Sequence, residues 1–138
     1  MLSLKAKSEV VCFGSDEIPG VWDQVKPHIQ RALDRGSIYS IEDIYTGLCD
    51  AKMQLWTWMD NGIEAALVTT IQEKDGIKYC LYLALGGENM AQWQYYMHYV
   101  EDWAKDSGCT EMRIYGRAGW ARVFGFEIEY TKMSRVLK

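Results

Sequence analysis

The sequence concentrates basic side chains near its C-terminal end, where they could meet a ligand that carries phosphate. Residues 110–138 hold six Lys or Arg and three Asp or Glu, whereas residues 1–109 hold nine and sixteen. A local excess of positive charge attracts phosphate groups, but it also occurs on an ordinary solvated strand edge. Both interpretations of this basic segment remain open.

Other kinds of chemistry have little support in the residue pattern. His28 and His98 are isolated, with no Cys or carboxylate at the spacing of metal ligands, so we expect no metal site. The chain contains no Gly-x-Ser-x-Gly elbow, no phosphate loop ending in Gly-Lys-Ser/Thr and no dinucleotide-binding Gly-x-Gly-x-x-Gly. Hydrolase, nucleotidase and dehydrogenase functions are therefore not indicated.

Length and composition predict a single globular domain that spans residues 1–138. Six Trp and nine Tyr are many for this length, and such side chains concentrate in cores, ligand clefts and interfaces. The formal net charge of −4 argues against general affinity for nucleic acids.

The cysteines and the N-terminal residues predict a cytoplasmic protein. Cys12, Cys49, Cys80 and Cys109 are scattered and form no C-x-x-C pair, so we interpret them as reduced thiols. Residues 1–5 lack the apolar stretch of a signal peptide, and no apolar run approaches the length that crosses a membrane.

The first half of the chain predicts a strand, two helices and a hairpin. The strand covers residues 9–13, and a helix with Pro19 in its first turn runs to Gly36. Ser40 is typical of the N-cap of a second, shorter helix. Residues 53–59 then alternate as in a strand, and Asn61-Gly62 predicts a tight turn into a return strand over residues 63–71.

The second half predicts a central strand followed by a β-α-β unit. The later residues of the segment 77–85 are apolar on both faces of the expected strand, which indicates a strand covered on both sides. A long helix from Asn89 to Ser107 follows, and then a strand, a short helix and a last strand. The order β-α-α-β-β-β-α-β-α-β predicts an α/β fold of the α+β type, with a mixed, mostly antiparallel sheet and helices on both faces.

This order of elements resembles the GNAT acyltransferase superfamily across nearly the whole chain. The stretch from Gly116 to Arg122, followed by Gly125-Phe126, is also similar to small GNAT-like proteins encoded by tailed bacteriophages. The resemblance implies acetyl-coenzyme A as the acyl donor and an amine as the acceptor.

The resemblance also implies where the cofactor would bind. In the superfamily the pyrophosphate lies on backbone N–H groups at the start of the long helix, where a helix N-terminus attracts anions. The matching stretch lacks the superfamily's Arg/Gln-x-x-Gly-x-Gly/Ala run, and the glycine pair in it is equally typical of a plain strand-to-helix turn. The implied cofactor-binding residues are Leu85, Gly86, Gly87, Asn89, Met90 and Ala91, with Arg117 or Arg122 as a charged clamp.

Catalytic residues are implied less directly. The position that carries the superfamily's general-acid tyrosine is Ala121 here, which leaves Tyr115 as the substitute. Glu64 and Glu88 are the carboxylates available as a general base, although Glu88 would repel phosphates. A packed strand tyrosine and a solvent-facing strand glutamate are the alternative interpretations of Tyr115 and Glu64.

Two functions therefore stay open at the level of sequence. The first is an acetyl-coenzyme A dependent N-acetyltransferase with an unidentified amine acceptor. The second is a non-catalytic GNAT-like phage protein that acts as a virion component, an assembly factor or an inhibitor of a host protein. In both cases the aromatic helix over residues 90–107 is the expected contact with a protein partner or a second copy, in the host cytoplasm or the virion.

Overall fold

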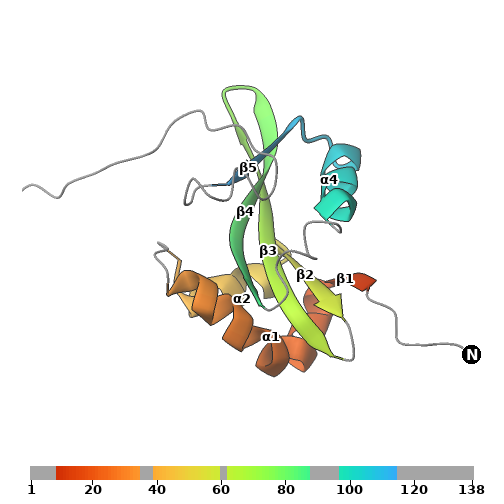
Figure 1. Cartoon of the computed structure of the whole chain (residues 1–138). Coiled ribbons are helices and arrows are strands. Elements are labelled where there is room, and N and C mark those ends of the chain that lie inside the picture. The colour runs from red at the N-terminus through yellow and green to blue at the C-terminus, as the bar shows by residue number, and fades with distance from the viewer. Residues whose placement is uncertain (1–8, 35–38, 60–61, 88–96, 115–138) are drawn as a thin grey trace, which may run out of the picture.

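The computed structural model describes residues 9–34, 39–59, 62–87 and 97–114 of the chain. These residues form a five-stranded sheet with the order β1-β2-β3-β4-β5 (Figure 1). Strands β1 to β4 pair antiparallel with their neighbours, and β5 pairs parallel with β4. The strands are β1 (Glu9–Phe13), β2 (Gln54–Met59), β3 (Ile63–Lys74), β4 (Ile77–Gly87) and β5 (Glu111–Ile114).

Two helices lie between β1 and β2. The helix α1 (Ile18–Leu33) follows a short 3₁₀ turn, η1 (Ser15–Glu17), and carries Pro19 in its first turn as predicted. The helix α2 (Ile41–Cys49) starts with a capping box, in which the Asp43 N–H donates to Ser40 Oγ at 3.1 Å and the Ser40 N–H donates to Asp43 Oδ2 at 3.2 Å. The predicted N-cap is thus confirmed.

The β3–β4 hairpin is longer than the sequence pattern indicates. Its turn is Asp75-Gly76, with φ of 54° and 79°, which suits a two-residue hairpin turn because both residues are left-handed. We expected the return strand to end at residue 71, but β3 continues to Lys74. Residues 71–74 pair with residues 77–80 of β4, and this pairing extends the strand although its last side chains are exposed.

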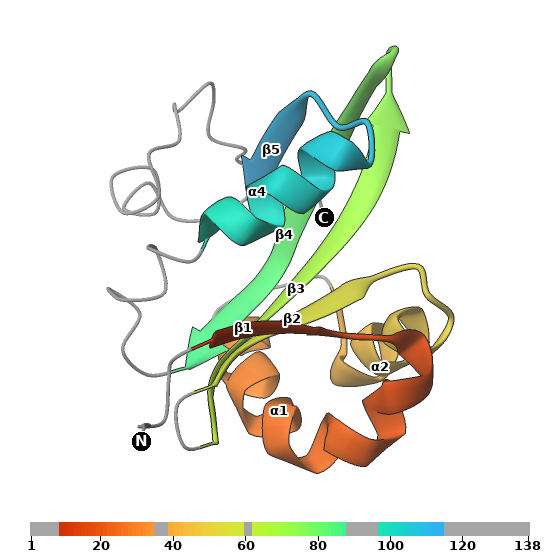
Figure 2. The same ribbon diagram turned by 90° about the vertical axis from the view of Figure 1, so that its right-hand side faces the viewer.

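The sheet is covered on both faces (Figure 1 and Figure 2). On one face α1 and α2 pack on the sheet through a core cluster that consists of Ile18, Val25, Ile29, Leu33, Ile44, Leu48, Leu55, Ala66, Val68 and Ala84. On the other face α4 (Met97–Asp106) packs through a cluster of Trp56, Trp58, Ala65, Leu67, Tyr82, Leu85, Met97 and Val100. The predicted two-sided burial of β4 is therefore confirmed.

The predicted fold class is confirmed: the structure is α+β, with a mostly antiparallel sheet between helices. The predicted order is reproduced from β1 to β5, and the predicted last helix and last strand lie outside the described residues. In the ranges that the structure describes, no helix is both long enough and apolar enough to cross a membrane. Those ranges also contain no cluster of potential metal ligands.

Candidate functional site

The glycine pair at the end of β4 is explained by close packing. Gly86 pairs with Ala66 and Gly87 pairs with Ala65, so both belong to the strand, whereas the sequence suggested that they form the turn after it. A Cβ on Gly86 would overlap the backbone carbonyl oxygen of His28 in α1. Gly86 therefore lets the helix backbone reach the strand, which an alanine could not do.

At position 87 a glycine is required for two reasons, its backbone conformation and its close packing. Its φ of 145° lies in the region that favours glycine, and a Cβ there would lie 2.5 Å from the carbonyl oxygen of Glu64. The two glycines thus allow α1, the start of β3 and the end of β4 to meet at one corner. We call this the β4 corner, and its described residues are His28, Arg31, Ile63, Glu64, Gly86 and Gly87.

Glu64, a proposed general base, lies at the β4 corner. The register of β2 and β3 shifts here, because Trp58 pairs with Ala65 while Met59 pairs with Ile63, so Glu64 is the extra residue of a β-bulge. Bulges redirect side chains and are frequent beside active sites. The half-buried Glu64 is therefore placed next to the glycine pair, 22 positions away in sequence, by the fold alone.

The β4 corner also contains two side chains, His28 and Arg31, that the sequence did not assign to a site. His28 Nε2 lies 3.2 Å from the carbonyl oxygen of Ile63, and His28 Nδ1 lies 2.7 Å from Nη2 of Arg31. The sequence shows no Cys or carboxylate at metal-ligand spacing from His28, and its partners are instead a carbonyl oxygen of β3 and an arginine one helical turn away. The i, i+3 spacing of His28 and Arg31 was the signal that could have indicated this pair.

A second bulge lies next to the last described pair of β4 and β5. Val68 pairs with Ala84 and Thr69 pairs with Tyr82, so Leu83 is the extra residue on β4. The β4–β5 ladder runs from Tyr79 paired with Glu111 to Tyr82 paired with Ile114. Within the described residues, β4 therefore continues from Leu83 to Gly87 with no strand on its β5 side, while β5 lies beside the half of β4 nearer the β3–β4 turn (Figure 2).

The paired part of β4 and β5 is closed by side chains. Tyr82 packs with Met97 and Val100 of α4 and with Met112 of β5, whereas Leu83 packs on the opposite face with the α1 and α2 core. Burial, followed by the nearby Glu101 carboxylate, raises the pKa of the Tyr82 hydroxyl. Any opening for an extended ligand beside β4 therefore has to begin after Tyr82.

The remaining predicted site residues divide into two groups. The side chain of Leu85 is buried in the core cluster beneath α4. Only the backbone groups of Leu85 are therefore available at the edge of β4. Glu88, Asn89, Met90, Ala91, Tyr115, Arg117 and Arg122 lie outside the described residues. Of the predicted residues, the structure thus brings Glu64, Gly86 and Gly87 together at the β4 corner.

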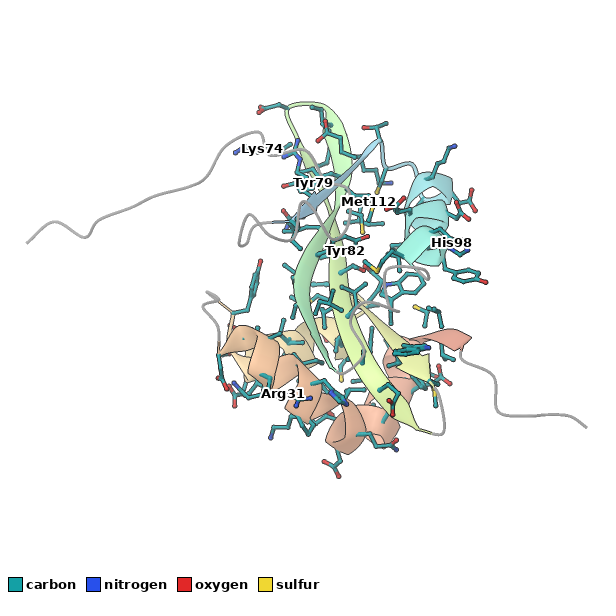
Figure 3. The ribbon with its side chains drawn as sticks, viewed as in Figure 1. Arg31, Lys74, Tyr79, Tyr82, His98 and Met112 are labelled. Carbon is teal, nitrogen blue, oxygen red and sulfur yellow. The ribbon has the colours of Figure 1, made fainter. Side chains whose placement is uncertain are left out.

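The opposite end of the sheet holds a separate polar group. The guanidinium carbon of Arg113 lies 4.0 Å from the ring centre of Tyr79, and Arg113 Nε donates to Glu111 at 2.9 Å. The Tyr79 hydroxyl donates to Gln72 at 2.9 Å. Figure 3 shows Tyr79 and Lys74 at this end and Arg31 at the other, so this group is distinct from the β4 corner.

Comparison with known proteins identifies the fold. No protein-family model and no curated protein sequence matches the chain. Among solved structures, an aminoglycoside acetyltransferase from an uncultured soil metagenomic sample, in complex with sisomicin, is similar over 95% of this chain and 97% of its own, with 13% identity and a TM-score of 0.69.

Two further structures agree with this match. A GCN5-related N-acetyltransferase from Ralstonia eutropha is 13% identical, with 95% and 99% of the two chains covered and a TM-score of 0.65. A predicted acetyltransferase from Clostridium acetobutylicum with acetyl-CoA is 10% identical, with 96% of each chain covered and a TM-score of 0.65. The chain therefore has the fold of the GCN5-related N-acetyltransferases.

Proposed function

We propose that this protein is an N-acetyltransferase that uses acetyl-coenzyme A and an amine acceptor. The proposal is supported by the fold and by one structural observation, the edge of β4 that continues past Tyr82. From Leu83 to Gly87 β4 extends beyond its last described pair with β5, and this is the part of the strand at which we place the cofactor.

The chemistry of the cofactor fits this edge. The pantetheine arm of coenzyme A is extended and contains two amide groups, so it can pair with a strand edge as another strand would. The edge ends at the β4 corner, where Glu64 and the cation Arg31 lie. An arm along β4 would thus direct one end of the cofactor toward the corner, where we place Leu85, Gly86, Gly87, Asn89, Met90 and Ala91 as its binding residues.

The acyl-transfer roles are assigned to residues as follows. When bound, acetyl-coenzyme A supplies the activated acyl group. Glu64 or Glu88 accepts the proton that the amine loses through a chain of waters, because the thioester lies at the far end of the extended arm from the phosphates. Tyr115 donates a proton to the departing thiolate. Arg117 or Arg122 neutralises phosphate charge. The net charge of −4 favours a cationic amine as the acceptor.

Binding is tested by thermal unfolding in the presence of acetyl-coenzyme A. A ligand at 100 times its Kd stabilises the folded state by about 2.7 kcal/mol. For a domain of this size, that raises Tm by about 9 °C. A titration that leaves Tm unchanged up to millimolar acetyl-coenzyme A would contradict the proposal.

Turnover is tested by following the release of coenzyme A thiol with a panel of amines that includes aminoglycosides, polyamines and peptide N-termini. At least one amine should accelerate thiol release above the rate of hydrolysis. Glu64→Gln should lower that rate without reducing the Tm shift with acetyl-coenzyme A, because the substitution removes a base and a charge that repels phosphates while it keeps the shape of the side chain.

The non-catalytic alternative is favoured by a different observation. Tyr99 on α4 is 51% exposed, and its ring lies 4.1 Å from that of His98, so an aromatic pair faces outward from the helix. Exposed aromatic side chains are frequent in protein interfaces. In this alternative the chain is a GNAT-like phage protein that binds a host protein or a virion component through α4. It would then release no coenzyme A thiol with any amine.

We also propose a cytoplasmic location and a homodimer formed through α4. The location is supported by the four free cysteines, including the exposed Cys12, because such thiols persist in reducing compartments. The dimer is supported by the exposed Tyr99. Analytical sedimentation of the wild type and of Tyr99→Glu tests the dimer. The wild type should have the molar mass of two chains, and the variant should have a lower molar mass.

A further inference from the structure

We infer that Arg31, held in place by His28, is a cation of the coenzyme A phosphate site at the β4 corner. This inference rests on the proposed function and adds a residue from α1 to it. Arg31 is the one Lys or Arg among the described residues of the β4 corner, where Glu64 contributes a carboxylate. A phosphate at this corner would therefore have Arg31 as its cationic partner.

The packing of α1 places this cation at the end of β4. The carbonyl oxygen of His28 is so close to Gly86 that only a glycine fits there. Arg31 follows three residues later, which puts it on a neighbouring stripe of the same helix. In Figure 3 Arg31 lies at the end of the sheet away from the β3–β4 turn, which is the end where β4 stops.

The hydrogen bonds of His28 determine how Arg31 is oriented. The carbonyl oxygen of Ile63 can only accept a hydrogen bond, so His28 Nε2 must carry the proton that it donates over 3.2 Å. In the neutral ring Nδ1 then has a lone pair, and Arg31 Nη2 donates to it at 2.7 Å. The imidazole thus acts as a support between the backbone of β3 and the guanidinium.

Arg31 keeps its capacity to bind an anion. It is exposed, and within the described part of the chain it forms no ion pair. The nearby carboxylate of Asp34 accepts a hydrogen bond from Gln30 at 2.9 Å instead. A guanidinium has five N–H donors, and one bond to His28 leaves most of its donors for phosphate oxygens.

The position of this charge matters because the corner otherwise repels phosphates. Glu64 lies at the corner, and the first 109 residues hold sixteen acidic and nine basic side chains. Positive charge close to a phosphate is effective over a distance of only about 8–10 Å in physiological salt. A single oriented arginine at the corner therefore has more influence on phosphate binding than the overall charge of the protein.

The experiment compares two ligands across matched variants. Acetyl-coenzyme A carries the phosphates, and acetyl-pantetheine has the same thioester arm without them. The affinity of each is measured by calorimetry for the wild type, Arg31→Gln, Arg31→Glu and Lys26→Glu. Lys26 is an exposed cation of the same helix, so Lys26→Glu makes the same change of charge as Arg31→Glu away from the corner.

We expect Arg31→Glu to weaken acetyl-coenzyme A binding by about tenfold and Arg31→Gln by about threefold. Lys26→Glu should change it by less than about twofold, since exposed and distant charges are screened. Acetyl-pantetheine should bind all four proteins equally. His28→Ala, which frees Arg31, should weaken acetyl-coenzyme A binding while the affinity for acetyl-pantetheine is kept.

Two results separate this inference from the proposed function. The role of Arg31 is overturned, and the transferase proposal stands, if the wild type binds acetyl-coenzyme A and Arg31→Glu binds it equally well. The same holds if Arg31→Glu lowers the affinity for acetyl-pantetheine as much as the affinity for acetyl-coenzyme A. If the wild type binds neither ligand, both are overturned. Thermal unfolding of each variant confirms that the exposed substitutions leave the fold intact.

Discussion

At the scale of single residues, the β4 corner forms because two of its residues are glycines. Gly86 and Gly87 remove the Cβ atoms that would hold α1 and β3 away from the end of β4. This contact places His28 beside Ile63 and Arg31 beside His28. The polar groups of the corner are thus positioned by close backbone packing.

Gly86→Ala is predicted to destabilise the protein by about 3 kcal/mol, because the added methyl group would overlap the carbonyl oxygen of His28 and α1 would have to shift. Urea unfolding measures the change. Gly20→Ala is the matched control: Gly20 lies in α1 with no atom within 4 Å of its added Cβ, so alanine should stabilise by about 0.5 kcal/mol through helix propensity. Equal stability of Gly86→Ala and wild type would contradict the packing argument.

At the scale of elements, the sheet contains two β-bulges, at Glu64 and at Leu83. The bulge at Glu64 turns the start of β3 toward the corner, and the bulge at Leu83 coincides with the last paired residues of β4 and β5. Between the bulge at Leu83 and the corner, β4 presents the edge on which the proposed cofactor arm would lie. The helices α1 and α2 hold this edge from one face and α4 from the other.

The start of α2 gives an element-scale prediction. Ser40→Ala removes the side-chain acceptor of the Asp43 N–H and should cost about 1 kcal/mol in the free energy of unfolding. Thr46→Ala, on an exposed position within α2, should be neutral or slightly stabilising. Chemical denaturation of both variants measures the difference. An unchanged stability of Ser40→Ala would show that the capping box contributes nothing.

At the scale of the whole molecule, buried ionisable groups link stability to pH. Burial, and to a smaller degree the neighbouring Cys109, raises the pKa of the Cys80 thiol from 9.0 to about 12. Burial also raises the pKa of the Tyr82 hydroxyl. Between pH 9 and 12 the unfolded chain therefore releases protons that the folded chain keeps. The folded state is stabilised by this difference below pH 9 and loses the stabilisation as the pH rises.

The free energy of unfolding is accordingly predicted to fall above pH 9, by at most about 1.4 kcal/mol per pH unit for each such proton. Urea unfolding at pH 8, 9 and 10 measures the slope. Cys80→Ala removes one of the groups, so its stability should fall less steeply than that of the wild type over the same range. Identical slopes for the two proteins would contradict the assignment.

The sequence by itself determined the type and order of the elements. Alternating apolar residues, the Ser40 cap and the turn residues act locally, so they predicted α2, the β2–β3 hairpin and the two-sided burial of β4 without reference to the rest of the chain. The same reasoning missed the end of β3 at Lys74, because pairing with β4 extends a strand whose exposed side chains carry no pattern.

Only the tertiary structure decided what meets at the end of β4. His28, Glu64 and Gly86 are far apart in sequence, and their proximity depends on the approach of α1 and on a bulge, which no local pattern encodes. Long-range packing therefore gives His28 a carbonyl partner on β3 and makes it a support for Arg31. It also showed that the glycine pair belongs to the strand, because a close helix backbone requires small residues there.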